Sequence, residues 1–362
     1  MKRTVTLLIV LCLLLCACGP KYEVPYASTE ATTEATTEAT TEATTEPTEP
    51  PILYRHPLTG EPLDAPYTGR PTAIVVNNIK AALPQYGIGN ADMIYEVETE
   101  GGITRLLAIF TTLDKTGSIG PVRSARTYFS NISASYDVPM AHCGGSSNAL
   151  AGKYDQNNKL AKWDHIDQMS NGSYFYRDKE RRSQGYNYEH TLFTTGENMV
   201  AVLAKKGYDK TSGAEVSYGL QFADEPTIAG ETANSITVTF RGKKTTTLTF
   251  TNAGLYEASQ YGKAHVDAGI GKTQAYRNIL VLKATQTFKH DGTYNRAYYD
   301  LIGEGEGFYA CNGQIVPIKW TRSAVTAQFA YTLADGTPLT LCAGKTYVAV
   351  IGTNGSANVA YQ

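Results

Sequence analysis

The amino-acid sequence predicts an α/β fold whose second half is mostly β-structure, and two observations carry this prediction. Residues 70 to about 220 alternate apolar runs with glycine-rich turns and helical stretches, a pattern typical of α/β proteins. From Ser235 onward, short runs of alternating apolar and polar residues dominate, and turns such as GKK, DGT and ADGT separate them.

The first residues are typical of a signal peptide over residues 1–17. Lys2 and Arg3 precede an apolar run from Val5 to Leu15, which is shorter than the roughly 20 residues of a membrane-spanning helix. The residues before Cys18 read Leu-Cys-Ala and resemble a bacterial lipobox, so we expect cleavage before Cys18 and lipidation of its thiol. The alternative is a simple signal peptide that is cut nearby. Lipidation predicts a protein held by membrane lipid at the extracytoplasmic face of the cell membrane.

Residues 18–51 form the predicted tether, a Thr/Glu repeat that ends in prolines. The repeat has almost no apolar surface to bury, so we expect a disordered linker. Seven of the chain's 34 acidic residues and three of its 32 basic residues precede Ile52, which leaves 27 acidic and 29 basic residues beyond it. This balance gives no charge excess that would favour nucleic acid as a partner.

The remaining chain is predicted to form an α/β module over residues 52–230 and a β-rich module over residues 231–362. The predicted strands of the first module are Thr72–Asn77, Met93–Thr99, Leu106–Thr112 and Pro139–Cys143. The predicted helices are Val122–Ser135, Asn148–Asp155 and Thr195–Lys206. Cys311 and Cys342 both lie in β-rich sequence, where they form either a disulfide or two buried free thiols.

A first candidate site lies in the segment ADMIYEVETEGGITR. In a strand over Met93–Thr99, the alternation places Glu96, Glu98 and Glu100 on one face, and a turn at Gly101-Gly102 brings Arg105 back to the same edge. Three buried carboxylates need water, basic partners or a metal. Two interpretations of these carboxylates are possible. They form either a solvated face with one structural arginine pair or a polar binding site. No HxxxH or paired-cysteine spacing supports a metal, and we expect neither a metal nor a cofactor.

A second candidate is the segment SIGPVRSAR. Pro121 suits the first turn of a helix, which would place Arg123 and Arg126 on one helical face. The helix start and two guanidinium groups would suit an anionic ligand, but Glu96 and Glu100 are equally good internal partners.

Two further segments carry polar groups in patterns that occur at sites. The segment MAHCGGSSN predicts a strand, a glycine-rich turn at Gly144-Gly145-Ser146 and a helix start. His142 is a candidate base, and the simpler interpretation of Ser146 is a helix N-cap. The segment from 172 to 195 mixes tyrosines with Arg177, Asp178 and His190. It suits either a binding surface or an irregular loop packed on a sheet.

Taken in order, RPTAIVVNN, ADMIYEVETEGGITR, IGPVRSAR, AHCGGS and FYRD resemble the YerB-like lipoprotein family of Gram-positive bacteria. YGKAHVD, RNILVL, GFYACNGQIVPIKW and AGKTYVAVI resemble the second module of that family. The resemblance implies a three-layer α/β first module and a smaller β-rich second module, and it implies no biochemical activity. The motif positions also include Asn78, which joins the candidate ligand-binding residues.

Two functions from different classes follow. The first is a surface-exposed binding lipoprotein whose polar pocket, with Arg105, Arg123 and Arg126 opposite Glu96 and Glu100, takes an envelope ligand or an envelope protein. The alternative is an enzyme acting on cell-wall glycan or peptide. Its candidate acid and base groups are Glu96, Glu100, His142 and His190.

Overall fold

The computed structural model describes residues 54–151, 160–211, 213–291 and 294–362. The predicted signal peptide, the lipidated Cys18 and the Thr/Glu linker therefore lie outside the described residues. Ile52–Gln362 forms one compact unit, and the boundary predicted between residues 230 and 231 falls inside it, directly before strand β12. The helices that the structure describes are not long and apolar enough to cross a membrane.

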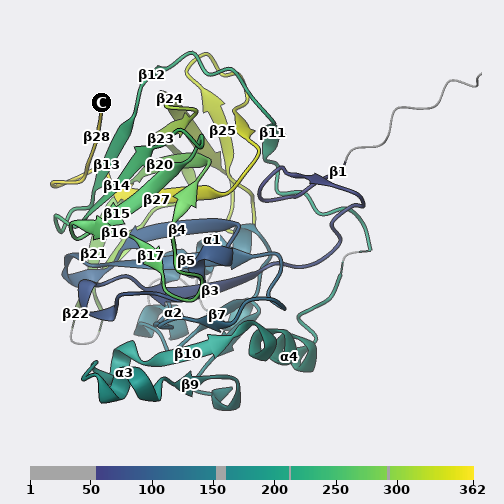
Figure 1. Cartoon of the computed structure of the whole chain (residues 1–362), viewed down its shortest axis with the longest axis vertical. Coiled ribbons are helices and arrows are strands. Elements are labelled where there is room, and N and C mark those ends of the chain that lie inside the picture. Colours follow the sequence, from purple (N-terminus) through teal and green to yellow (C-terminus); the bar gives the residue numbers. More distant parts are fainter. Residues whose placement is uncertain (1–53, 152–159, 212, 292–293) are drawn as a thin grey trace, which may run out of the picture. The chain divides into compact units, whose positions relative to one another are not determined.

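A large mixed sheet runs through this unit and contains strands from both halves of the sequence (Figure 1). β27 and β4 join the two halves as a parallel pair, with Thr346 opposite Met93 and Val350 opposite Val97. In spatial order the strands are β12 (Glu231–Thr232), β24 (Gln314–Arg322), β23 (Gly303–Cys311), β20 (Asn278–Ala284), β27 (Thr346–Gly352), β4 (Met93–Glu98), β5 (Thr104–Phe110), β3 (Thr72–Asn77), β7 (Met140–His142) and β8 (His165–Asp167), with β25 (Ala330–Leu333) paired to β24.

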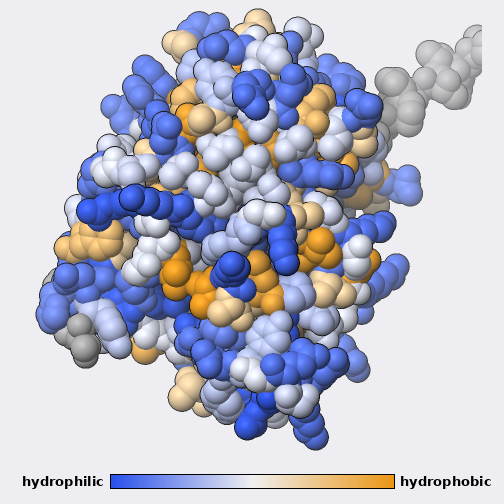
Figure 2. Space-filling model, turned by 60° about the vertical axis from the view of Figure 1, so that its left-hand side comes forward, coloured by the Kyte–Doolittle hydropathy of each residue, from blue (hydrophilic) through white to orange (hydrophobic). Residues whose placement is uncertain are grey.

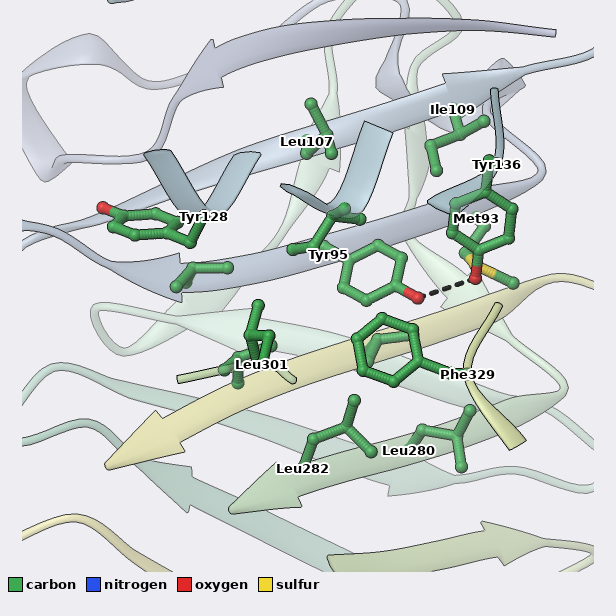
Figure 3. Packing of buried hydrophobic residues seen from close by; sticks show 14 of the residues in the cluster. Met93, Tyr95, Leu107, Ile109, Tyr128, Tyr136, Leu280, Leu282, Leu301 and Phe329 are labelled. Carbon is green, nitrogen blue, oxygen red and sulfur yellow. Dashed lines mark hydrogen bonds between the residues drawn. The ribbon is translucent and has the colours of Figure 1, made fainter. Parts of the chain in front are cut away.

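Both faces of this sheet are buried, because successive residues of a strand point to opposite faces and each face has its own apolar cluster. On β4, Tyr95 packs in one cluster and Ile94 in the other. Figure 3 shows the first cluster, where the hydroxyls of Tyr95 and Tyr136 are 2.7 Å apart and Phe329 and Leu280 lie nearby. Strands buried on both faces have nearly continuous apolar sequences, and the runs in β3 and β5 follow this pattern, whereas β4 includes Glu96 and Glu98.

Smaller sheets and a few helices cover the two faces. The second sheet has the order β16 (Lys263–Ala264), β15 (Tyr256–Gln260), β14 (Thr245–Phe250), β13 (Ser235–Thr239) and β28 (Asn358–Tyr361), with β19 (Ala275–Tyr276) on β15. A third has the order β6 (Ser118–Ile119), β10 (Leu192–Thr195) and β9 (Tyr176–Arg177). The two-stranded pairs are β1 (Tyr54–Arg55) with β2 (Pro62–Leu63), β11 (Gln221–Ala223) with β26 (Thr340–Cys342), β17 (Val266–Asp267) with β18 (Lys272–Thr273), and β21 (Gln286–Asp291) with β22 (Tyr294–Tyr299).

The helices are short and cover only part of each face. The α-helices are α1 (Thr127–Ser135), α2 (Ser147–Ala151), α3 (Lys179–Ser183) and α4 (Gly196–Lys206). The 3-10 turns are η1 (Lys80–Ala82), η2 (Ile88–Asn90), η3 (Glu100–Gly102), η5 (Leu160–Lys162), η6 (Gly172–Tyr174) and η7 (Tyr188–His190). On the face shown in Figure 2, hydrophilic side chains predominate and hydrophobic ones gather in small patches.

The second half is β-rich, as predicted, but the three-layer α/β arrangement of the first module is not confirmed. Over the described residues as a whole, strands contain more of the chain than helices do, and β13, β14 and β15 of the second half cover much of the sheet face that helices would cover in a layered α/β protein. The four strands predicted in the first half are confirmed as β3, β4, β5 and β7. Helix α4 is confirmed as well, with the Thr195 hydroxyl accepting the Asn198 N–H at its start.

The helix predicted from Val122 is wrong in its first turn, because α1 begins only at Thr127. Val122 instead forms a bridge with Val76, and the N–H of Arg123 donates to the Val75 carbonyl at 2.9 Å. These contacts keep residues 122–126 extended. The helix predicted over Asn148–Asp155 corresponds to α2 as far as Ala151, and its remainder lies outside the described residues.

Candidate functional site

Glu96 lies at the centre of a closed polar network between the two halves of the chain. Its carboxylate accepts hydrogen bonds from the hydroxyls of Thr246 at 2.8 Å and Tyr347 at 2.7 Å, and it forms an ion pair with Lys244. Asn78 and Thr104 donate to the same carboxylate at 2.9 and 2.6 Å. Both carboxylate oxygens are therefore fully used inside the protein.

The charge state of Glu96 follows from this network. Burial raises the pKa of the Glu96 carboxyl, but the charge and hydrogen bond of Lys244 and the hydroxyls of Thr104 and Tyr347 outweigh it, so the pKa lies below its ordinary value. Asn78 extends the network, because its amide oxygen accepts from Gln85 at 2.7 Å and Gln260 at 2.9 Å. Asn78 and Glu96 thus hold the two halves together, away from solvent.

Only two of the three predicted carboxylates share a face. Glu96 and Glu98 lie on the same face of β4, whereas Glu100 follows the strand in the turn η3, where Gly101 and Gly102 adopt positive φ angles of 76° and 70°. This turn directs the Glu100 carboxylate toward Arg126, which donates through Nε at 3.0 Å and also through Nη2. Glu100 therefore belongs to a different group from Glu96.

Arg105, Arg123, Arg126 and Arg296 form an arginine cluster around Glu100 and Glu189. Arg126 and Arg296 both form ion pairs with Glu100, and Arg123 pairs with Glu189 at 3.0 Å. Burial raises the pKa of Glu100, but the hydrogen bonds and charge of Arg126, together with Arg105, lower it to about 2. Of the two internal partners considered for Arg126, the structure shows Glu100, while Glu96 lies on the opposite face of the sheet.

Arg105 is the most buried member of the arginine cluster. It is 3% exposed, its Nη1 donates to the carbonyl of Ser124 at 2.6 Å, and its buried Nε has no hydrogen-bond partner. Among the described residues it forms no ion pair. Burial and the positive charges of Arg126 and Arg123 hold the pKa of its guanidinium well below the usual range.

The arginine cluster lies at the N-terminus of α1. Arg126 is the N-cap residue, and its own side chain forms no capping hydrogen bond with this helix. A helix start without a side-chain cap leaves N–H groups that attract negative charge. An anion is favoured at this place by three features: the helix start without a side-chain cap, the Arg105 Nε without a partner, and the several guanidinium groups.

His142 and the glycine-rich turn form a separate polar group at the end of β7. The His142 Nδ1 donates to the Gly144 carbonyl at 2.8 Å, so its Nε2 accepts from Nδ1 of His165 at 3.0 Å. Burial and His165 lower the pKa of His142 to about 4, against the opposing charge of Asp167. His142 is thus a neutral, fully buried ring with both nitrogens engaged.

The turn that follows is held by backbone contacts. The N–H of Gly144 donates to the Asp167 carboxylate at 2.8 Å, and Gly145 forms a bridge with Ala125. The Ser146 hydroxyl accepts the Ala149 N–H at 3.3 Å, which is the contact expected of an N-cap. These residues position the segment that carries Arg123 and Arg126.

Arg177, Asp178 and His190 order the loop between β9 and β10. Arg177 donates to the Tyr188 carbonyl at 2.7 Å and lies over the Tyr188 ring, and Asp178 caps α3 by accepting the Arg181 N–H at 3.0 Å. His190 Nδ1 accepts from the Asn77 amide at 3.1 Å. Burial lowers the pKa of His190, despite the neighbouring Glu189. The loop thereby carries Glu189 to Arg123.

The sequence did not reveal Arg296 or Lys244 as partners of Glu100 and Glu96, because each lies in an ordinary strand or turn far along the chain. The Cys311 and Cys342 thiols are both free and buried in this structure. In the described ranges no three His, Cys, Asp or Glu side chains are grouped in a way that could hold a metal ion.

Comparisons with known proteins give a consistent result. The chain matches the family described as "Protein of unknown function (DUF3048) N-terminal domain" over residues 58–209, and its companion "Protein of unknown function (DUF3048) C-terminal domain" over residues 236–348. It is 30% identical over 322 residues to "Putative lipoprotein YerB" of Bacillus subtilis (strain 168), which covers 84% of this chain and 90% of that protein. The crystal structure of YerB from Bacillus subtilis matches with a TM-score of 0.69 at 27% identity, over 84% of this chain and 99% of that one.

Proposed function

We propose that this chain, which belongs to the DUF3048 family as the YerB-like motifs predicted, is a lipid-anchored extracytoplasmic protein. We also propose that its arginine cluster binds an anionic group of an envelope ligand. The ligand is either a small envelope molecule or an acidic segment of an envelope protein. Carboxylate and phosphate groups are the chemistry that such a cluster would recognise.

The anchoring part of the proposal is supported by the sequence and by the relative. Lys2, Arg3, the apolar run and the lipobox-like residues before Cys18 fit a lipoprotein signal, and the relative's name carries the same description. A Cys18→Ser variant should lose incorporation of labelled fatty acid and be released from the membrane fraction. Unchanged labelling of that variant would contradict the assignment of Cys18.

The observation that carries the binding proposal is the charge imbalance at the arginine cluster. The guanidinium groups of Arg105, Arg123, Arg126 and Arg296 share the two carboxylates of Glu100 and Glu189 within the described residues. Arg105 retains a buried Nε without a partner. The Arg123 side chain is 19% exposed, so an anion can approach from its side. A bound anion would supply both the missing charge and the missing acceptor.

The geometry favours binding over the catalytic alternative. Both oxygens of Glu96 and both ring nitrogens of His142 are engaged inside the protein, and the two side chains belong to separate groups. Glu100 has a pKa of about 2, so it is a poor proton donor or acceptor near neutral pH. Incubation with peptidoglycan fragments tests this reading, because any enzyme-dependent change in fragment mass would overturn it.

The binding test uses inorganic phosphate and acetate as probes in calorimetric titrations of the full chain. Arg123→Gln should weaken binding about tenfold, as expected for one charge-assisted hydrogen bond, and should change the free energy of unfolding by less than about 1 kcal/mol. Arg55→Gln removes a surface ion pair with Asp224 and serves as the matched control with unchanged binding. Equal affinity of Arg123→Gln and wild type would contradict the proposal.

A further inference from the structure

We infer a second binding site, for an amino acid or short peptide, in a cavity of about 330 Å³ between the η1 segment and strands β15 to β17. Leu83 and Pro84 line it from the first half of the chain, and Gln260, His265 and Val266 line it from the second. Pockets of about 300 Å³ and more that lie between two parts of a fold are common places for small ligands. None of its residues belongs to the arginine cluster, so this site is independent of the proposed function.

Gln260 supplies a buried acceptor that the protein leaves unused. The side chain is 4% exposed, and its Nε2 donates to the Asn78 amide oxygen at 2.9 Å, which fixes the orientation of the amide. Its buried Oε1 has no hydrogen-bond partner. Buried polar atoms are nearly always paired, so this oxygen calls for a donor from a ligand. A ligand N–H or ammonium group would satisfy it.

His265 adds a second acceptor, and its protonation state can be worked out from its neighbour. Gln85 donates through Nε2 to the Asn77 carbonyl at 3.0 Å and to the Asn78 side chain, so its Oε1 must accept from Nε2 of His265 at 3.0 Å. Burial and the charge of Lys244 lower the pKa of His265 to about 4. The ring is therefore neutral with its proton on Nε2, and its Nδ1 is an acceptor.

The rim of the cavity carries positive charge. Lys80 and Lys263 both line it, both are exposed, and neither forms an ion pair with any described carboxylate. Leu83, Pro84 and Val266 give the cavity an apolar wall. A carboxylate would be attracted to the two ammonium groups, and a short apolar side chain would cover the wall.

Together these groups are complementary to a zwitterionic ligand with a small apolar part. Its ammonium or amide N–H would donate to Gln260 Oε1 and His265 Nδ1, and its carboxylate would lie near Lys80 and Lys263. Free amino acids and dipeptides combine these features. A neutral saccharide would leave the lysines unused, and a bare phosphate would leave the two acceptors without donors.

The test uses the dipeptide alanyl-alanine in ligand-observed NMR titrations of the full chain. Wild type should bind it saturably in the millimolar range or tighter. Lys263→Gln and Lys80→Gln should each weaken binding about threefold, as expected for one exposed charge contact. Ala264→Trp, at an exposed lining position, should fill the cavity and weaken binding more than about tenfold. Lys179→Gln, on α3, removes an exposed charge elsewhere and should change nothing.

Two chemical variants of the probe separate the contacts. N-acetyl-alanyl-alanine lacks the ammonium group, and alanyl-alanine amide lacks the carboxylate; each should bind more weakly than the parent. Absence of saturable binding to wild type, or equal binding by the folded Ala264→Trp variant, would overturn the inference. Equal binding of all three probes would also overturn it, because it would show that the polar groups do not select the ligand.

Discussion

The carboxylate of Glu96 on β4 and the ammonium group of Lys244, 148 residues further along the chain, form an ion pair in which both side chains are almost fully buried. A buried pair of this kind joins the halves of the fold only while both partners are present, since either charge alone would lack compensation. The three hydroxyl groups around it complete the hydrogen bonding of the carboxylate.

Lys244→Met should therefore lower the free energy of unfolding by about 3 to 5 kcal/mol, because it leaves the Glu96 charge buried without a cation. Denaturant titrations followed by circular dichroism measure this loss. Lys243→Met changes the exposed neighbouring lysine and should stay within about 0.5 kcal/mol of wild type. Similar stabilities of the two variants would show that the pair contributes little.

The stability of the protein should fall in acid partly because of Glu100. Its pKa is about 2 in the folded protein, below the ordinary value of 4.5, so the unfolded chain binds the proton more tightly. The resulting stability, about 2 kcal/mol after allowance for partial exposure, is fully present above about pH 5 and is lost as the pH falls toward 2. Glu100→Gln should be less stable at pH 7 and show a flatter profile over this range. Parallel profiles for the two proteins would contradict this account.

Gly242 and Gly102 make a close backbone contact that a larger residue would break. A Cβ atom on Gly242 would lie 2.0 Å from the Cα of Gly102, and the Gly242 N–H also donates to Glu98 at 3.2 Å. Gly242→Ala should destabilise the protein by about 2 kcal/mol or more through overpacking, as a thermal melt can measure. Gly117→Ala is the matched control, since nothing lies within 4 Å of its added Cβ. An unchanged melting temperature for Gly242→Ala would show that the backbone at this contact can shift at little energetic cost.

His142 and His265 should remain neutral well below the ordinary histidine pKa of 6.5. Burial lowers the pKa of each to about 4, so folding disfavours their protonation and acid removes stability as the pH falls from about 6.5 toward 4. In NMR titrations the ring carbons of both should show little change between pH 8 and pH 5. The same rings in urea-unfolded protein should titrate near pH 6.5. A folded-state midpoint near 6.5 for either ring would contradict its assignment as buried and neutral.

The sequence predicted those features that depend on neighbouring residues. The apolar runs of β3 and β5 and the helix α4 were found because burial on two faces and the periodicity of a helix leave local patterns in the sequence. Glu100 was one of the two internal partners considered for Arg126, together with Glu96, because the segments that contain these residues also have recognisable local patterns. Lys244 and Arg296 leave no such pattern, because their partners are brought close only by the complete fold. The start of α1 was misplaced because the distant strand β3 holds Val122 in extended form.

The pairing of β27 with β4 has a consequence for the order of synthesis. The backbone edge of β4 that faces β27 becomes available as soon as residues 93–98 are made, yet its partner, residues 346–352, is among the last segments to appear. Until then, a buried strand of the central sheet presents open hydrogen-bonding groups and apolar side chains. A chain cut near residue 230 should therefore aggregate rather than fold, and the growing protein needs protection of this edge for most of the time that it takes to be made.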